Sequence, residues 1–108
     1  MTLEELLKFI DLEDSRIRKH YGNPPKKERV LARAVKLMEE SGELANEILK
    51  SLAMQRDSKL TQKSSSELSE EFADVIITTL LLAKSSDVDV NKALLSKVEK
   101  IKKRNYKK

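Results

Sequence analysis

Two pairs of acidic residues, each with three-residue spacing, lie beside apolar residues in the two most hydrophobic stretches of the chain. The first is Glu40-x-x-Glu43 in LMEESGELANEILKSL (37–52), and the second is Glu71-x-x-Asp74 in SEEFADVIITTLLLA (69–83). Residues three apart on a helix project toward the same side. A carboxylate beside a hydrophobic core is costly unless a cation or a hydrogen-bond donor compensates it. The four carboxylates therefore suggest a divalent-cation site between two helices.

The composition predicts a small all-α protein. The 108 residues are enough for one domain, residues 1–108, and the two Gly and two Pro favour a few long helices. The absence of Cys excludes disulfides and thiolate metal sites, and the single His20 cannot supply a His-rich zinc site. The N-terminal residues lack the plan of a signal peptide, and the apolar run 75–83 is too short to cross a bilayer. We therefore expect a soluble, cytoplasmic protein.

The spacing of apolar residues predicts four helices. We expect them over about 3–20, with Thr2 as N-cap and Glu5 completing a capping box, over 26–52, from a Ser cap near 66 to 84, and after an Asp89 cap. Residues 53–66 are polar and are expected to form a connection. The segment from Val75 is apolar nearly all round, which predicts packing against a second copy of the chain.

The helix predicted over 26–52 combines a broad apolar face with a polar stripe along one border. The stripe consists of residues at three- and four-residue steps: Arg33, Lys36, Glu40, Glu43 and Glu47. Gly42 interrupts this helix at a cost of roughly 1 kcal/mol in helix propensity. Its expected benefit is the close approach of a neighbouring helix or a ligand.

The acidic constellation has two interpretations from the residues alone. Carboxylate oxygens without soft ligands suit Mg²⁺ or Mn²⁺, and a ferritin-like iron site is disfavoured because it needs more than one His. Alternatively, all four acids are surface carboxylates paired with Lys or Arg. The C-terminal residues 97–108 contain seven Lys or Arg and one acid, which suits either a solvated helix end or attraction of phosphate.

A family resemblance favours the metal site. EESGEL (39–44), followed by EFADVI (71–76), is similar to the EExGEL…ExxDV pattern of the MazG-like all-α nucleoside triphosphate pyrophosphohydrolases, and VDVNKALLSKVEKIKKR (88–104) resembles their fourth helix. The resemblance covers about 29–104. It implies a four-helix MazG-like bundle completed by oligomerisation as a homodimer or a dimer of dimers, with the site near the protomer interface.

The resemblance also implies roles for individual residues. It makes Glu40, Glu43, Glu71 and Asp74 the Mg²⁺ ligands, with Mn²⁺ as a substitute, places Lys97 and Arg104 against the triphosphate, and leaves Glu39 or a ligand carboxylate to accept a proton from water. Ile101 stands where family members often have Asn, so the polar group that would make one sugar or phosphate contact is absent at this position. The implied reaction is hydrolysis of a (deoxy)nucleoside triphosphate to the monophosphate and pyrophosphate, as house-cleaning of the nucleotide pool.

Two alternative functions are compatible with the sequence. One is a phosphoribosyl-ATP pyrophosphohydrolase, which shares the fold and the acidic pattern. The other is a non-catalytic helical dimerisation module with a basic tail for nucleic acid, although we do not expect nucleic acid or a membrane as partner. The base and sugar preference cannot be inferred from the residues.

Overall fold

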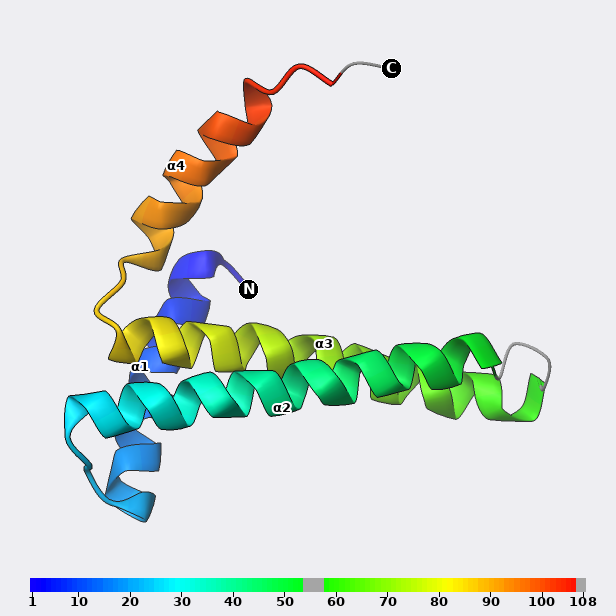
Figure 1. The fold of residues 1–108 in the computed structure, drawn as a ribbon, viewed down its shortest axis with the longest axis horizontal. Helices are drawn as coiled ribbons and strands as arrows, with labels where there is room; N and C mark the ends of the chain where they lie inside the picture. Colours follow the sequence, from blue (N-terminus) through cyan, green and yellow to red (C-terminus); the bar gives the residue numbers. More distant parts are fainter. Residues whose placement is uncertain (54–57, 107–108) are drawn as a thin grey trace.

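The computed structural model describes residues 1–53 and 58–106, and only the backbone of residues 53 and 58–66. The described residues form four helices and no strand: α1 (Leu3–Tyr21), α2 (Lys26–Ala53), α3 (Ser58–Ser85) and α4 (Val90–Lys102). The long helices α2 and α3 lie side by side and antiparallel, α1 packs across α3, and α4 leaves this assembly at the end of α3 (Figure 1). The predicted all-α fold is confirmed.

The first helix has the predicted cap. The Glu5 backbone N–H donates to Thr2 Oγ1 at 3.1 Å, and the Thr2 backbone N–H donates to Glu5 Oε1 at 3.4 Å. These two hydrogen bonds use backbone donors that the first turn of a helix leaves unpaired. The helix ends at Gly22, whose φ of 91° is open to glycine without steric cost. The short connection to α2 then contains Pro24 and Pro25.

The start of α3 differs from the prediction. Residues 58–66 belong to the helix, so the expectation of a polar connection there, ended by a Ser cap near 66, was wrong. This stretch contains neither Gly nor Pro. Once the apolar part of α3 is helical, each further residue adds a hydrogen bond at little cost, so the helix propagates into the polar stretch. The rest of the predicted connection, 54–57, lies outside the described residues.

The interior of the chain is small and lies where α1 meets α3. Ile10 and Leu80 are the buried apolar side chains among the described residues. Along the segment 75–83, burial within the chain is uneven, since Leu80 is buried whereas Ile76 is 53% exposed. The apolar side of α3 is therefore only partly covered by α1 and α2.

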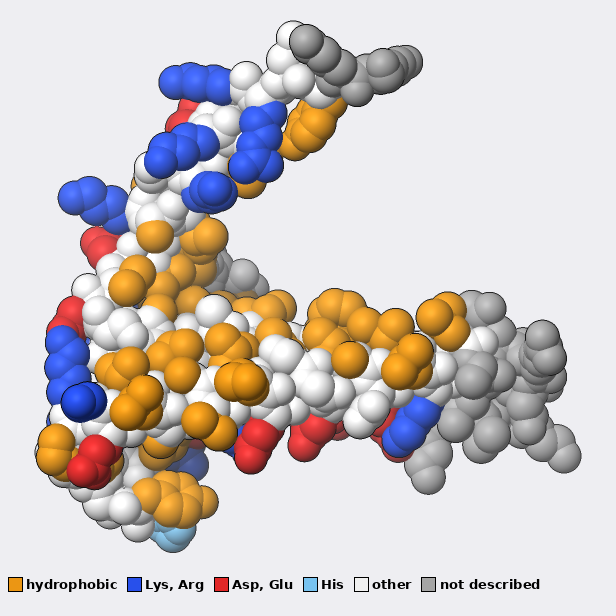
Figure 2. Space-filling view, viewed as in Figure 1, with side chains coloured by type: hydrophobic (Ala, Val, Ile, Leu, Met, Phe, Trp, Pro, Cys, Tyr) orange, Lys and Arg blue, Asp and Glu red, His pale blue; other side chains and the backbone are white. Residues whose placement is uncertain are grey.

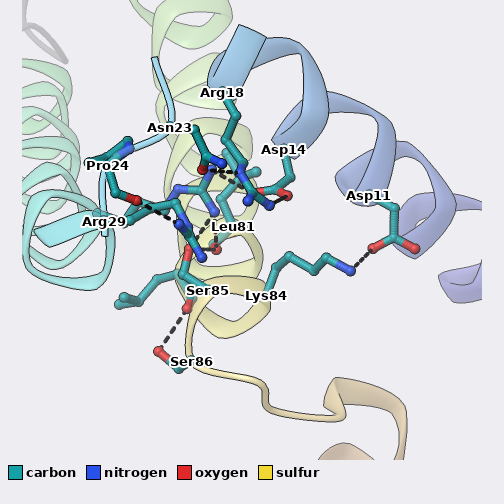
Figure 3. Close-up of polar contacts among 12 residues, drawn as sticks. Asp11, Asp14, Arg18, Asn23, Pro24, Arg29, Leu81, Lys84, Ser85 and Ser86 are labelled. Atoms are coloured by element: carbon teal, nitrogen blue, oxygen red, sulfur yellow. Dashed lines mark hydrogen bonds and ion pairs between the residues drawn. The ribbon is translucent and has the colours of Figure 1, made fainter. Parts of the chain in front are cut away.

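A buried ion group joins the first three helices (Figure 3). Arg33 Nη2 of α2 lies 2.6 Å from Asp14 Oδ1 of α1, and Arg33 Nη1 donates to the Leu81 carbonyl of α3 at 3.0 Å and to the Ser85 hydroxyl. Arg18 contacts the other oxygen of Asp14 at 3.4 Å. Burial alone would raise the pKa of Asp14, but the guanidinium groups of Arg33 and Arg18 outweigh it and lower that pKa.

The turn between α3 and α4 sets the direction of α4. Asp87 adopts a left-handed φ of 56° and pairs with Lys26 at the start of α2, and the Val88 N–H donates to the Ala83 carbonyl at 3.0 Å. Asp89 caps α4 by accepting from the Lys92 N–H at 3.0 Å, as predicted. No helix in the described part of the chain is long and apolar enough to cross a membrane.

Candidate metal centre

Three of the predicted ligands converge between α2 and α3. Glu40 and Glu43 lie one turn apart on α2, and Glu71 reaches them from α3. Each residue offers one carboxylate oxygen, and these three oxygens all lie within 4.8 Å of one another. Because the two helices are antiparallel neighbours, residues about 30 positions apart in the chain meet at one point along the pair.

The convergent carboxylates are partly withdrawn from water. Glu40 is only 9% exposed, Glu71 is half-buried and Glu43 is exposed. Oε2 of Glu40 and Oε2 of Glu71 are both buried and accept no hydrogen bond. A buried carboxylate oxygen without a donor is costly, so these atoms favour binding of a cation that the described side chains do not supply.

The electrostatics of Glu71 lead to the same conclusion. Burial raises the pKa of Glu71, and the negative charges of Glu43, Asp74, Glu40 and Glu47 raise it further. Among the side chains that the structure describes, none that is basic opposes these effects on the pKa of this carboxyl. A bound divalent cation would reverse them by favouring the ionised form.

The predicted fourth ligand lies apart from the other three. Asp74 is exposed and does not share the 4.8 Å cluster, although it is one turn from Glu71 and its charge contributes to the raised pKa of that residue. The structure thus brings together Glu40, Glu43 and Glu71, with Asp74 at the border.

Glu47 extends the acidic group and was not among the predicted ligands. Its Oε2 is buried without a hydrogen-bond partner, while its Oε1 accepts from Lys50 Nζ at 3.2 Å. The signal was present in the sequence, because Glu47 follows Glu43 by four residues in the polar stripe. The family pattern ends at Glu43 and therefore gave no reason to include it.

Lys36 forms ion pairs with the acidic residues at the N-terminal end of the group. Lys36 Nζ lies 3.4 Å from Glu39 Oε2 and 3.4 Å from Glu40 Oε1. These hydrogen bonds with Glu39 and Glu40, together with their charges, raise the pKa of Lys36. The side chain of Glu39, the predicted proton acceptor, is 59% exposed and turned toward this lysine. Lys36 therefore neutralises the near end of the group and leaves Glu43 and Glu71 without such a partner among the described ion pairs.

The predicted phosphate-binding residues are not brought to the carboxylates of the same chain. Lys97 lies on α4 and Arg104 follows it, and both are exposed. Helix α4 diverges from the α2–α3 pair along its length (Figure 1). Ile101, which stands where family members often have Asn, is 41% exposed on the same helix.

The residues present fit a hard divalent cation. The donor set consists of carboxylate oxygens, two of them buried and without partners, with no sulfur or imidazole ligand in the cluster. Oxygen donors of this kind suit Mg²⁺ or Mn²⁺, which retain positions for water and for phosphate oxygens. The fold and the site together define an all-α protein with a carboxylate centre on a helical pair.

The comparison with protein families identifies this architecture. The family model described as MazG nucleotide pyrophosphohydrolase domain matches residues 29–107, and the chain belongs to that family. No curated protein and no solved structure matched the chain in the corresponding comparisons. The match supports nucleotide pyrophosphohydrolysis as the class of activity, and members of the family generally depend on a divalent metal. It begins at Arg29, so α1 precedes the matched region.

Proposed function

We propose that this protein hydrolyses (deoxy)nucleoside triphosphates to the monophosphate and pyrophosphate in the presence of Mg²⁺. The observation that carries the proposal is the convergence of Glu40, Glu43 and Glu71 from two helices within 4.8 Å. Two of these residues have a buried oxygen without a donor. An acidic group of this kind repels a triphosphate unless a bound cation offsets the negative charge. Enzymes that act on phosphates commonly use carboxylate-bound divalent cations for this purpose.

Glu40, Glu43 and Glu71 would hold the cation, and Asp74 stands one turn along α3 as the fourth carboxylate. When bound, Mg²⁺ or Mn²⁺ supplies positive charge to phosphate oxygens and lowers the pKa of water. The fold holds these like charges close together, which lowers its stability in the absence of a cation. The same repulsion would strengthen the binding of a divalent ion, because the ion would relieve it.

A carboxylate in or beside the centre would accept the proton of the attacking water. Attack of water on the α-phosphorus releases pyrophosphate and requires a base for the water's proton. Glu39 is one candidate because it is exposed beside Glu40, and a carboxylate of the metal centre is the other. Lys36, which contacts both Glu39 and Glu40 at 3.4 Å, would position the Glu39 carboxylate beside the centre.

Lys97 and Arg104 of another copy of the chain would neutralise negative charge on the leaving pyrophosphate. The reason is geometrical: α4 of the same chain runs away from the α2–α3 pair (Figure 1). A homodimer or a dimer of dimers would supply the missing cations to each carboxylate centre. The biological role would be removal of unwanted nucleotides from the pool.

Pyrophosphate release from a panel of nucleotides, with and without Mg²⁺, tests the proposal. The panel should contain canonical and damaged ribo- and deoxyribonucleoside triphosphates together with phosphoribosyl-ATP. We expect Glu43→Gln to lower kcat/KM at least about a hundredfold, because it removes a charged ligand where even supporting residues matter tenfold or more. Circular dichroism should show unchanged helical content, since Glu43 is exposed.

Glu70→Gln is the matched control. It removes one carboxylate from an exposed position next to Glu71 in sequence, outside the cluster. Turnover should remain close to that of the unmodified chain. Equal activity in the Glu43 and Glu70 variants would contradict the metal assignment. Turnover of phosphoribosyl-ATP alone would replace the proposed substrate class, and salt-sensitive nucleic-acid binding without any hydrolysis would favour the non-catalytic alternative.

A further inference from the structure

Three arginine side chains line one small cavity beside the connection between α1 and α2. Figure 3 shows Arg18 and Arg29 drawn together there, next to Asn23 and Pro24 of the connection. The cavity has a volume of about 200 Å³. We call it the arginine cavity, and its lining consists of Ile17, Arg18, Tyr21, Gly22, Pro24, Arg29, Ala32 and Arg33. Among the described residues that line it, none is acidic.

The arginines of this cavity are more sheltered from water than the cations of α4. Figure 2 shows several Lys and Arg side chains along α4 standing out into solvent. Arg33, by contrast, is 8% exposed, and Arg29 is half-buried. A guanidinium that is withdrawn from water loses hydration and lies in a region of lower dielectric constant. Its charge therefore acts more strongly on an anion that comes close.

The carboxylates beside the cavity offset only part of its positive charge. Asp14 lies 2.6 Å from Arg33 and 3.4 Å from Arg18, so one negative charge faces two guanidinium groups. Arg29 forms no ion pair with any residue that the structure describes. Three positive charges against one negative charge leave a surplus of two positive charges at the cavity.

Arg29 also has hydrogen-bond donors that the described side chains do not use. Its Nη1 donates to the Pro24 carbonyl at 3.0 Å, whereas its Nε is buried without an acceptor. Asp87 on the α3–α4 turn pairs with Lys26 instead. The Nε and Nη2 groups of an arginine form a fork that matches two oxygens of one anion. The edge of Arg29 that the Pro24 contact leaves open therefore suits a phosphate or a carboxylate.

The size and the walls of the cavity narrow the class of ligand. Ile17, Pro24 and Ala32 contribute apolar surface. Pockets for drug-sized ligands have volumes of about 300–1,000 Å³, so this smaller cavity suits a phosphate group with a short organic substituent. A phosphate monoester carries close to two negative charges at neutral pH, which matches the surplus of two positive charges. A carboxylate supplies only one.

We propose that the arginine cavity binds the phosphate group of a small phosphate monoester. The fork of Arg29 would donate to two phosphate oxygens, and Arg18 and Arg33 would add positive charge. A bound phosphate would hold the end of α1, the connection and the start of α2 together. Arg29 and Glu40 are 11 residues apart on α2, about 16 Å along the helix axis. The site is therefore separate from the carboxylate centre and does not depend on the hydrolytic activity.

Isothermal titration calorimetry of the metal-free full chain with phenyl phosphate, at about pH 7.5, tests the site. Without a metal the carboxylate centre repels this anion. Arg29→Gln should raise the dissociation constant at least about tenfold, because it removes a charged fork. Arg16→Gln is the matched control, since Arg16 is 68% exposed and lies outside the cavity. Absence of binding to the unmodified chain overturns the proposal, as does an equal loss in the two variants.

Ala32→Leu tests the cavity without changing a charge. Ala32 is exposed on α2 and lines the cavity, and leucine is a good helix former. The melting temperature without ligand should therefore change little. The larger side chain should occupy part of the cavity and raise the dissociation constant for phenyl phosphate at least about tenfold. An unchanged affinity would show that the anion binds elsewhere and overturns the proposal, even where Arg29→Gln fails to fold.

Inorganic phosphate and benzoate distinguish the chemistry of the ligand. Inorganic phosphate lacks the apolar group and should bind several-fold more weakly than phenyl phosphate. Equal affinities would support the phosphate site and identify the inorganic ion as its ligand. Benzoate keeps the ring but carries one charge, so it should bind at least about tenfold more weakly than phenyl phosphate. Tighter binding of benzoate would overturn the assignment to phosphate.

Discussion

Two partly buried carboxylates lie beside the polar stripe of α2, Asp14 from α1 and Glu71 from α3, and they differ in the charge of their neighbours. At Arg33, the Asp14 carboxylate meets two guanidinium groups, which lower its pKa although burial opposes this. Two turns further along, Glu71 meets the charges of other acids, and its pKa is raised. Burial acts in the same direction on both carboxyls. The sign of the neighbouring charge therefore separates a contact that stabilises the fold from a carboxylate group whose charges repel one another.

The largest expected effect on stability comes from breaking the ion pair between Asp14 and Arg33. Arg33→Met should lower the free energy of unfolding by about 3–5 kcal/mol, because it leaves the Asp14 carboxylate buried without its closest cation. Chemical denaturation with a helical signal measures this. Arg16→Met is the control, since Arg16 pairs with Glu13 from a side chain that is 68% exposed. Its effect should stay within about 0.5 kcal/mol. Equal effects of the two substitutions would show that burial of the pair contributes nothing.

Removing a charge from the acidic group around Glu71 should have the opposite effect on stability. Glu71→Gln in metal-free protein should raise the melting temperature by a few degrees, because it removes one of several repelling charges. The same substitution should abolish most of the further rise that Mg²⁺ causes in the unmodified chain. Thermal melts with a chelator and with Mg²⁺ measure both. A lower melting temperature in the chelator would contradict the view that these charges repel one another at a cost.

A smaller effect, which depends on pH, should distinguish Asp14 from a neutral hydrogen-bonding partner. Because the folded state lowers the pKa of Asp14 below its ordinary 3.8, this carboxylate stabilises the fold above that pH. The contribution should disappear as pH falls through the lower folded value. The difference in unfolding free energy between the unmodified chain and Asp14→Asn should therefore shrink below about pH 4. A difference that stays constant down to pH 2.5 would exclude the ionic contribution.

Local patterns were sufficient to predict most of the helices and half of the site. Apolar spacing, the Thr2 and Asp89 caps and the Pro24-Pro25 pair act within a few residues, so the bounds of α1 and α2 and the start of α4 were predicted closely. Three- and four-residue steps likewise predicted that Arg33, Glu40 and Glu43 share one border of α2, which the ion contacts and the carboxylate cluster bear out.

The remaining features depend on how the helices meet, which a single helix does not encode. Asp14 resembles any charged residue on a surface helix, and its burial follows only from the way α1 crosses α3 beside Arg33. Asp74 shares a side of α3 with Glu71, but the crossing of the two long helices decides which carboxylates converge. The direction of α4 depends on the Asp87–Lys26 contact, which joins residues 61 positions apart.

The buried guanidinium of Arg33 has a consequence for the order of events in folding. Its partners come from α1 and α3, so it loses its water only when three helices have met. The contacts between α2 and α3 can form earlier, because these two helices are neighbours in the sequence. The Arg33 contacts therefore belong to the final docking of α1. Removing them should accelerate unfolding while leaving the refolding rate nearly unchanged.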